Sequence, residues 1–483
     1  MHRKTKIVAT VGPASESEEM LLALAKAGVN VFRLNFSHGT HEDHQARIDR
    51  IRKVNAEHGF KCAILQDLQG PKIRIGLMEK GNEGVEIFAG DKLVFTNEDI
   101  VGNAQRVSTP YKGMYRDVQL GERILMDDGK LEVKVVGVDG MDVITEVVYG
   151  GLLKQKKGVN LPNTNISQPS VTEKDWEDLK FGLKNDVDWI ALSFVRTAEE
   201  ILEIQKYIQE QGSEAKVVAK MEKPEAVTNM DSIIEATDAI MVARGDLGVE
   251  IPSEDVPMIQ KRLVEKSNLA AKPVIVATQM LESMIDSPRP TRAEVGDVAN
   301  AVLDGADAVM LSAESASGKY PILAVQTMVN TILKVEHDND AKKLYYRHHT
   351  RVTEPGYESD EKENDNVVMT ASRLARDLRV KAIIGITTSG YTAVRLSHHR
   401  PKANTFIFTG NEKLLTQLSL YSGINAFKYN HLKDRSVEEV VGNIRDFLVE
   451  KGELEAGDLF INTLSMPLQE NNRTNTIKLS KVE

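Results

Sequence analysis

Residues 216–246 read Lys216-Val-Val-Ala-Lys-Met-Glu-Lys-Pro-Glu-Ala-Val-Thr-Asn-Met-Asp-Ser-Ile-Ile-Glu-Ala-Thr-Asp-Ala-Ile-Met-Val-Ala-Arg-Gly-Asp246 and predict a strand, a helix and a second strand. The runs 216–222 and 239–243 are short and apolar, which is typical of strands buried on both faces. The segment 224–235 between them is predicted to be helical. A helix between two buried strands indicates parallel strands joined by a crossover.

The same alternation continues on both sides of this unit. We expect eight buried strands, three before a long interruption and five after it, at residues 6–11, 29–36, 63–68, 187–194, 216–222, 239–243, 273–279 and 308–312. Helices are expected after them at 15–27, 42–57, 175–183, 198–209, 224–235, 257–270, 292–303 and 321–335. Eight strands, each followed by a helix, close a barrel, so the predicted fold is α/β with a (β/α)8 TIM barrel.

The interruption and the C-terminal part follow different patterns. Short alternating segments separated by turn signals between residues 72 and 169 predict an antiparallel β-barrel domain inserted after the third strand, on the face that carries active sites. Apolar runs at 382–388, 405–409, 426–429 and 459–464 predict a separate C-terminal α/β domain, after an acidic connection at 358–365. The expected domains are a catalytic barrel (1–71 and 168–340), an inserted lid (72–167) and a C-terminal domain for regulation or oligomerisation (341–483).

Composition restricts the classes of function. Lys and Arg number 61 and Asp and Glu 71, a net charge of −10, which gives no general attraction for nucleic acid or an anionic membrane. The single cysteine, Cys62, excludes an internal disulfide and a cysteine-rich zinc site. No apolar stretch approaches the roughly 20 residues that span a bilayer. We therefore expect a cytoplasmic protein, with neither nucleic acid nor membrane as partner.

Polar residues follow the expected strands at the end where such barrels place their catalytic groups. Glu222 and Asp246 follow adjacent strands and could ligate Mg²⁺, which takes its other oxygens from water and substrate; a solvated acid and a helix cap are the plainer alternative. Lys220 lies two residues before Glu222, on the same face of the strand. A lysine in an apolar strand needs a partner, and phosphate contact, proton transfer or Schiff-base chemistry would each use it.

Several long motifs resemble the pyruvate kinase family. They are Lys220-Met-Glu222, Met241-Val-Ala-Arg-Gly-Asp-Leu-Gly-Val-Glu-Ile251, Ala277-Thr-Gln-Met-Leu-Glu-Ser-Met284, Pro290-Thr-Arg-Ala-Glu294, 297–307 and Arg33-Leu-Asn-Phe-Ser-His-Gly39. The resemblance covers essentially the whole chain in the family's order. It implies Mg²⁺-dependent phosphoryl transfer from phosphoenolpyruvate to ADP, giving pyruvate and ATP, in a glycolytic homotetramer.

The resemblance also implies a role for individual residues. Glu222 and Asp246 would hold one Mg²⁺, a second would arrive with the nucleotide, and Lys220 would stabilise the migrating phosphoryl group. The remaining implied substrate and catalytic residues are Arg33, Ser193, Ala243, Arg244, Gly245, Thr278 and Ser312, and the implied nucleotide residues are Asn35, Arg74 and Lys157. Thr278 and Ser312, through water, are the expected route of the proton to the enolate.

One motif departs from the family in a way that bears on monovalent cations. Many members require K⁺ and carry a glutamate in a Gly-Pro-Glu motif, where this chain has Gly70-Pro71-Lys72. The ammonium group of Lys72 can provide the charge that K⁺ would supply. Leu68 also removes a hydroxyl that K⁺-dependent members carry, whereas the pocket positions Asn35, Ser37 and Asp67 remain. We therefore expect activity without K⁺; the plainer alternative is a surface lysine.

The C-terminal domain contains a candidate effector site. The residues Thr387, Thr388, Ser389, Gly390, Tyr391 and Thr392 follow a strand and open a helix, a suitable cradle for a phosphorylated effector, or else an ordinary capped turn. The later segment 466–474 lacks glycine and contains Glu470, so fructose bisphosphate is not favoured over a sugar monophosphate, AMP or no effector. Two rival functions are a Mg²⁺-dependent 2-oxo-acid aldolase and a non-catalytic metabolite sensor.

Overall fold

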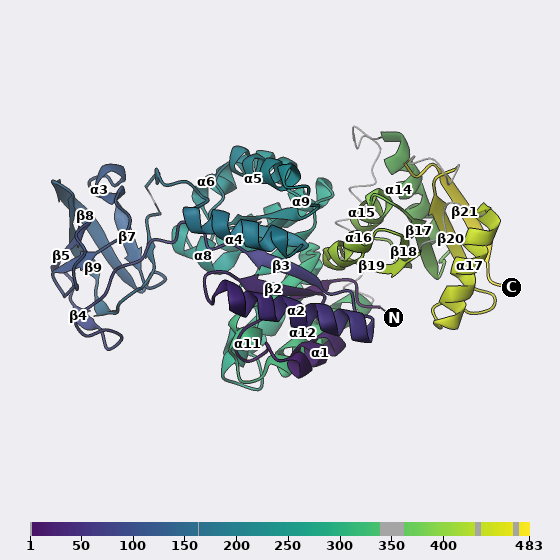
Figure 1. Cartoon of the computed structure of the whole chain (residues 1–483), viewed down its shortest axis with the longest axis horizontal. Helices are drawn as coiled ribbons and strands as arrows, with labels where there is room; N and C mark the ends of the chain where they lie inside the picture. The colour runs from purple at the N-terminus through teal and green to yellow at the C-terminus, as the bar shows by residue number, and fades with distance from the viewer. Residues whose placement is uncertain (1, 163, 339–361, 430–435, 467–472) are drawn as a thin grey trace.

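The computed structural model describes residues 2–162, 164–338, 362–429, 436–466 and 473–483. It consists of three bodies in a row (Figure 1), with an inserted β domain at one end, a barrel in the centre and a C-terminal α/β domain at the other end. The candidate effector loop 466–474 and the acidic run 358–365 fall partly outside the described residues. Within the described residues, no helix is long and apolar enough to cross a membrane.

The central domain is a closed barrel of eight parallel strands, as predicted. The barrel order is β1-β16-β15-β14-β13-β12-β3-β2. The strands are β1 (Lys6–Thr10), β2 (Val31–Asn35), β3 (Ala63–Asp67), β12 (Trp189–Leu192), β13 (Lys216–Met221), β14 (Ala239–Ala243), β15 (Val274–Ala277) and β16 (Ala308–Leu311). Their side chains are buried on both faces, against the barrel interior and against the helices that surround it, which explains the continuous apolar runs.

The barrel helices differ from the sequence prediction in two places that matter for the site. The expected helix 224–235 is two helices, α6 (Pro224–Thr228) and α7 (Met230–Ala236), because Asn229 interrupts it and donates through Nδ2 to the carbonyl of Arg196 at 2.9 Å. Gly245-Asp-Leu-Gly248 has the small residues typical of a loop whose N–H groups approach an anion, and the sequence predicts such a loop there, but these residues are instead part of helix α8 (Arg244–Glu250), whose Leu247 is fully buried. Packing of this leucine overrides the poor helix propensity of glycine.

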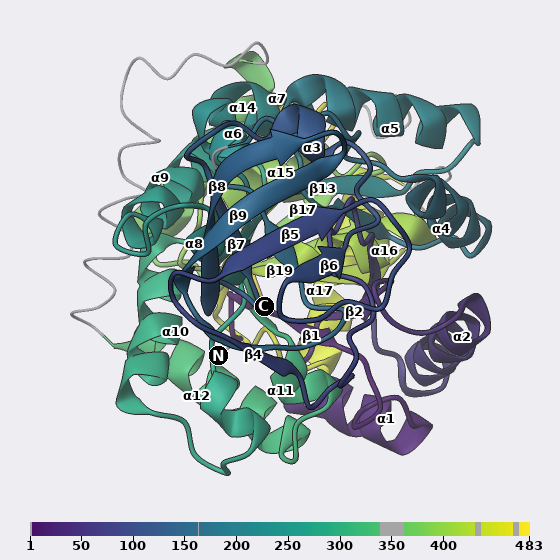
Figure 2. The ribbon, with the colours of Figure 1, turned by 90° about the vertical axis from the view of Figure 1, so that its left-hand side faces the viewer.

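Apart from η1 and α11, which were not predicted, the other helices of the barrel domain lie close to the predicted positions, and the helices form its outer ring (Figure 2). Capping boxes begin α2, α4, α5 and α10 and satisfy amide groups of the first turn. The remaining bounds are α1 (Glu18–Ala27), α2 (His41–His58), α4 (Glu173–Lys184), α5 (Ala198–Glu210), α9 (Val256–Leu269), η1 (Glu282–Ile285), α10 (Arg292–Asp304), α11 (Ala313–Ala316) and α12 (Pro321–His337).

The inserted domain is mostly antiparallel but is not one closed antiparallel barrel. Its hydrogen bonds form a six-stranded sheet, β11-β7-β8-β9-β5-β6, and a separate two-stranded sheet, β10-β4. Strands β5 and β6 are parallel because residues 97–105 carry the chain back before β6 begins. The elements are β4 (Val85–Ile87), β5 (Lys92–Thr96), β6 (Arg106–Ser108), α3 (Met114–Asp117), β7 (Arg123–Met126), β8 (Leu131–Asp139), β9 (Asp142–Tyr149), β10 (Gly151–Leu153) and β11 (Val159–Asn160).

The C-terminal domain is a five-stranded sheet of order β19-β18-β17-β20-β21. The antiparallel edge strand β21 was not predicted, because none of its residues is buried and its apolar signal is weak. The elements are α14 (Lys362–Asp377), β17 (Ala382–Ile386), α15 (Tyr391–His398), β18 (Asn404–Thr409), α16 (Glu412–Gln417), η3 (Leu418–Leu420), β19 (Ile424–Lys428), α17 (Val437–Glu450), β20 (Leu459–Leu464) and β21 (Thr476–Lys481).

The two outer domains contact opposite ends of the barrel. The inserted domain leaves the barrel after β3, at the carboxyl ends of the strands (Figure 1). The C-terminal domain packs on the amino ends, where the Trp189 and Tyr421 rings lie 6.2 Å apart and the Lys6 ammonium donates to the carbonyl of Ile424 at 2.6 Å. The carboxyl ends of the strands therefore face the inserted domain, and this is where the candidate site lies.

Candidate active site

A cleft of about 1020 Å³ opens between the inserted domain and the carboxyl ends of the barrel strands. Residues from both bodies line it, among them Lys72 and Asp128 of the inserted domain and Gly245, Asp246 and Ser312 of the barrel. A cleft between two domains at the carboxyl face of such a barrel is the usual place for a substrate.

Lys220 is the buried cation of this site. Its ammonium lies 2.8 Å from Glu222 Oε1 and 3.2 Å from Asp67 Oδ1, and donates to Ser193 Oγ at 2.7 Å. Burial disfavours the charged form, but the two carboxylates outweigh burial and raise the pKa of Lys220 above its ordinary value. Lys220 is therefore a fixed positive charge and a poor proton-releasing group or amine nucleophile at neutral pH.

Arg33 adds a second cation beside Lys220. Its Nε donates to Asp67 Oδ2 at 2.6 Å and its Nη1 to Thr10 Oγ1 at 2.9 Å. Burial alone would raise the pKa of Asp67, and the charges of Arg33 and Lys220 outweigh it and lower that pKa. Asp67 thus holds both cations at the ends of neighbouring strands.

Glu222 and Asp246 are the carboxylates available for a metal ion. Burial is the main reason that the pKa of Glu222 is raised, and the charge of Asp246 adds to it, against the effect of Lys220. The described part of the chain contains no cluster of three metal-ligating side chains. A pair of carboxylates, of which Asp246 lines the open cleft, fits Mg²⁺, because this ion keeps several water or substrate oxygens.

The segments on either side of the carboxylates have unusual backbone conformations. Thr278 and Phe194, which follow two barrel strands, have φ values of 67° and 56°. Positive φ is a genuine outlier for a β-branched residue such as threonine. The hydroxyl of Thr278 accepts a hydrogen bond from the amide of Gly245 at 2.7 Å, and a Cβ on Gly245 would lie 3.3 Å from that oxygen. Because Gly245 has no side chain, its amide can approach the Thr278 hydroxyl this closely.

Two strand segments join the inserted domain to the barrel, and we call them the hinge (residues 72–75 and 157–160). They run side by side, with the amide of Val159 donating to the carbonyl of Ile73 at 2.9 Å. The Arg74 guanidinium donates to the carbonyl of Lys156, and the Lys157 ammonium lies 2.6 Å from Asp127. Lys157 thus faces a carboxylate of its own domain.

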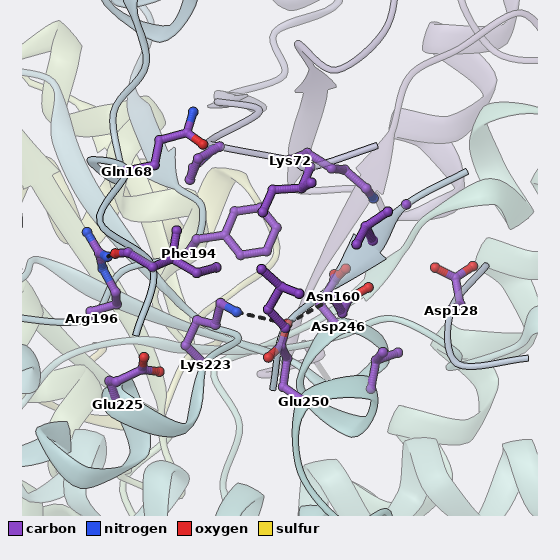
Figure 3. Close-up of a pocket in the computed structure, with 17 residues that line it drawn as sticks. Lys72, Asp128, Asn160, Gln168, Phe194, Arg196, Lys223, Glu225, Asp246 and Glu250 are labelled. Atoms are coloured by element: carbon purple, nitrogen blue, oxygen red, sulfur yellow. Dashed lines mark hydrogen bonds and ion pairs between the residues drawn. The ribbon is translucent and has the colours of Figure 1, made fainter. Parts of the chain in front are cut away.

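Lys72 belongs to a cluster of cations near His38. Burial first, and then the charges of Arg74, Lys72 and Arg33, lower the pKa of His38. Lys72 is half-buried and lines both the cleft and the adjoining pocket drawn in Figure 3.

The other positions of the expected cation pocket are close in the structure. Asn35 Oδ1 accepts a hydrogen bond from the Ser37 amide at 3.1 Å. Leu68 is 2% exposed, and its carbonyl accepts a hydrogen bond from the Ser193 hydroxyl at 2.7 Å.

Two expected substrate residues are engaged mainly within the protein. The Arg244 guanidinium lies 2.6 Å from Asp297 and donates to the carbonyl of Thr278 at 2.7 Å. The side chain of Arg244 is therefore held by other residues of the protein, and its backbone is the part that lies next to Gly245. The amide of Ser312 donates to the carboxylate of Glu314 at 2.7 Å. The amide of Ala243 belongs to the end of β14.

Four residues that hold side chains of the candidate site in place or lie beside the cleft were not predicted: Thr10, Lys223, Glu250 and Asp297. Lys223 and Glu250 form a buried ion pair of 2.9 Å beside the cleft. Their separation along the chain leaves no spacing pattern that could have identified them.

The candidate effector segment forms a turn at the start of α15. The Gly390 amide donates to Thr387 Oγ1 at 3.0 Å and the Tyr391 amide to Ser389 Oγ at 3.4 Å, while Thr388 and Ser389 are exposed. The guanidinium of Arg473 lies 5.4 Å from the centre of the Tyr391 ring. The Thr392 hydroxyl contacts Thr474 Oγ1 at 2.5 Å. The segment thus combines exposed hydroxyls with a nearby cation.

Comparison with known proteins identifies the family. Residues 2–325 match the family described as pyruvate kinase, barrel domain, and residues 365–480 match pyruvate kinase, alpha/beta domain. The chain belongs to the pyruvate kinase family. It is an enzyme of that type, and this bears out the resemblance seen in its motifs.

Individual relatives of the pyruvate kinase family match nearly the whole chain. Pyruvate kinases of Geobacillus stearothermophilus and Staphylococcus aureus are 43% and 44% identical over 482 residues, which is 99% of this chain and 80% of each relative. The crystal structure of a pyruvate kinase from Cryptosporidium parvum superposes with a TM-score of 0.92 at 35% identity, covering 100% of this chain and 96% of that one.

Proposed function

We propose that this pyruvate kinase family member transfers the phosphoryl group of phosphoenolpyruvate to ADP, giving pyruvate and ATP in glycolysis. The single observation that carries the proposal is Lys220, a buried ammonium held between Asp67 and Glu222 at the carboxyl ends of the barrel strands. Phosphoryl transfer requires mainly positioning and neutralisation of charge. A fixed cation of this kind, beside Arg33, serves both requirements.

Mg²⁺ is the proposed metal. Glu222 and Asp246 would hold one ion, and a second would arrive with the nucleotide. When bound, Mg²⁺ neutralises charge on the phosphoryl oxygens and on the enolate that leaves. Asp246 lines the cleft, and the charge of Lys220 favours the ionised form of Glu222 against the effect of burial, which raises its pKa.

Residues around the metal site would bind and orient the two substrates. The backbone of residues 243–246, together with Thr278, would bind the substrate carboxylate, and Arg33, Lys220 and Ser193 would bind the phosphoryl group. Arg74, Lys157 and Asn35 would face the nucleotide from the hinge and the rim. The proton that the enolate gains at carbon would come by way of Thr278 and Ser312 through water, because the raised pKa of Lys220 makes it a poor donor.

One coupled assay separates this function from its rivals. The purified chain is mixed with phosphoenolpyruvate, ADP and Mg²⁺, and ATP is measured. We expect ATP formation that stops when Mg²⁺ is chelated. Carbon–carbon cleavage of a 2-oxo acid without ATP formation would indicate an aldolase, and ligand binding without turnover would indicate a sensor.

We further propose that Lys72 replaces the monovalent cation. The support is its position on the cleft beside Arg74 and His38, at the place of the family's glutamate. The wild-type rate should change less than twofold between K⁺ and an inert salt of equal ionic strength. K72E should lose activity in the inert salt and regain it in K⁺. A large stimulation of the wild-type chain by K⁺ would contradict the proposal.

Regulation and assembly are proposed from the family alone. A phosphorylated effector, such as a sugar monophosphate or AMP, would bind the hydroxyls of residues 387–392 at the start of α15. The chain would form a homotetramer in the cytoplasm. Sedimentation with and without each phosphorylated compound, alongside the coupled assay, measures both properties.

A further inference from the structure

Glu250, the last residue of α8, joins the barrel to the inserted domain. The residue is 4% exposed, and its Oε1 accepts a hydrogen bond from Asn160 Nδ2 at 2.8 Å and lies 2.9 Å from the ammonium of Lys223. Figure 3 shows the three side chains converging beside Asp246. Asn160 belongs to the hinge, Lys223 follows β13 and Glu250 ends α8, so three separate elements meet at one carboxylate.

Helix α8 connects this carboxylate to the metal site. Asp246 lies four residues before Glu250, on the same side of the helix. The turn of the inserted domain at Gly129 lies close to the same helix, because a Cβ added there would be 4.0 Å from Val249 Cγ1. A shift of the inserted domain against α8 therefore acts on the helix that carries a proposed metal ligand.

The hydrogen bonds of Glu250 favour one position of the inserted domain, in which Asn160 contacts this carboxylate. Its other oxygen, Oε2, is buried and accepts no hydrogen bond from the described residues. If the hinge moves and Asn160 withdraws, Oε1 keeps only Lys223 as a partner. A buried carboxylate with too few donors is unfavourable, so the contact with Asn160 is either made or lost.

The ion pair between Lys223 and Glu250 lies wholly within the barrel domain. If Glu250 served only to stabilise the barrel, this ion pair would be enough. The bond from Asn160 is different because it crosses from one domain to the other. Asp128, in the turn after β7, lines the same cleft as Asp246, so the angle of the inserted domain sets the width of that cleft.

We infer that Asn160, Glu250 and Lys223 are positioning residues that hold the inserted domain at the angle required for nucleotide binding. The inference rests on the proposed function, in which ADP lies between the inserted domain and the barrel. The bond from Asn160 to Glu250 stabilises the closed cleft, and the ammonium of Lys223 holds Glu250 in place to accept it.

The first test removes the bond that crosses the domains. N160A should raise the KM for ADP at least fivefold, while the KM for phosphoenolpyruvate changes less than twofold and kcat less than threefold. N97A is the matched control, because Asn97 is also half-buried and donates through Nδ2 only within the inserted domain, to the carbonyl of Lys112 at 3.1 Å. N160S, which keeps a donor, should lie between N160A and the wild type.

The second test exchanges donor and acceptor. N160D places a carboxylate against Glu250 and should raise the KM for ADP more than N160A does. In the double variant N160D/E250Q, the amide donates and the carboxylate accepts, so at least half of that loss on a logarithmic scale should be recovered. If the bond between the two residues had no influence on nucleotide binding, the effects of the two substitutions on the KM for ADP would be additive instead.

The third test measures the position of the inserted domain directly. Cys62 is buried, so spin labels can be placed selectively on M141C, at the tip of the hairpin of β8 and β9, and on L202C, on α5. N160A should broaden the distance distribution between the labels without nucleotide, and N97A should leave it unchanged. Wild-type distances together with a wild-type KM for ADP in N160A would overturn the inference. A wild-type chain that forms no ATP would contradict the proposed function instead, and the distances would still test the role of Asn160.

Discussion

Each end of the barrel buries a lysine on a strand, and the two lysines have opposite properties. Lys220, near the carboxyl end of β13, lies within 3.2 Å of two carboxylates, and its pKa is raised. Lys6, at the amino end of β1, donates to the carbonyl of Ile424 instead. Burial first, and then the charge of Arg3, lower the pKa of Lys6 to about 7, with partial compensation from Glu336 and Asp307. Direct carboxylate contact decides whether a buried lysine keeps its proton.

The two ends also use their carboxylates differently. At the carboxyl end, Asp246 lines the cleft, and Glu222 lies 2.8 Å from the ammonium of Lys220. At the amino end, Asp307 lies 2.8 Å from Arg400, and Asp188 lies 3.2 Å from Lys413, both residues of the C-terminal domain. Burial raises the pKa of Asp188 even so. Charges at one end are therefore available to a ligand, whereas those at the other end hold two domains together.

The largest expected effect is on the active end. K220M should reduce ATP formation roughly 10³-fold or more, because the migrating phosphoryl group loses its fixed counter-charge. Proton exchange on pyruvate should remain largely intact. K216M, at the opposite end of the same strand, is the matched control and should keep its activity. Circular dichroism checks that both variants fold; loss of both activities in folded K220M would contradict the division of roles.

The next largest effect is expected at the amino end of the barrel, where a substitution should change the stability of the protein but not its activity. R400M leaves Asp307 buried without its cation, and breaking such a pair typically costs about 3–5 kcal/mol of unfolding free energy. Urea unfolding measures this change, and kcat should stay within about twofold of the wild type. R400K, which keeps a positive charge, should lose less. A drop below about 1 kcal/mol in R400M would mean that the interface relaxes around Asp307.

The pH dependence of stability should reveal Lys6. Its folded-state pKa of about 7 is below the ordinary value of 10.5, so the unfolded chain binds more protons between these pH values. The unfolding free energy should therefore rise with pH across this window, by at most about 1.4 kcal/mol per pH unit from this group. The slope is measured as the difference between wild type and K6M, which cancels other titrating groups. An identical slope in the two proteins would show that Lys6 stays charged.

The smallest effects should come from single hydroxyl groups at the two ends. Ser193 accepts a hydrogen bond from Lys220 at 2.7 Å, and Thr416 donates to Asp188 Oδ1 at 2.6 Å. S193A should lower kcat by about tenfold or less, and T416V should lower the unfolding free energy by about 1–3 kcal/mol without a change in kcat. A change in kcat in T416V would show that the amino end of the barrel influences the candidate site at the carboxyl end.

The barrel was predictable because its periodicity is local. Eight apolar runs, each followed by a helix, define the topology without any knowledge of contacts, and the closed order of strands confirms it. Polar residues after these runs indicated the end that carries the site, because parallel strands end together. The prediction was wrong about two local features, because it included neither the break at Asn229 nor the helix α8. Both features depend on contacts with other elements.

The sequence by itself determined the barrel, the inserted and C-terminal segments and the family, through patterns and motifs that lie within short stretches of chain. The roles assigned to individual site residues stay predictions. Only the tertiary structure decided which charges meet: Asp67 with Lys220 and Arg33, or Glu250 with Lys223 and Asn160. The physical reason is that a pKa, an ion pair or a hinge contact depends on distance in space between residues far apart in the chain, and no spacing in the sequence records that distance.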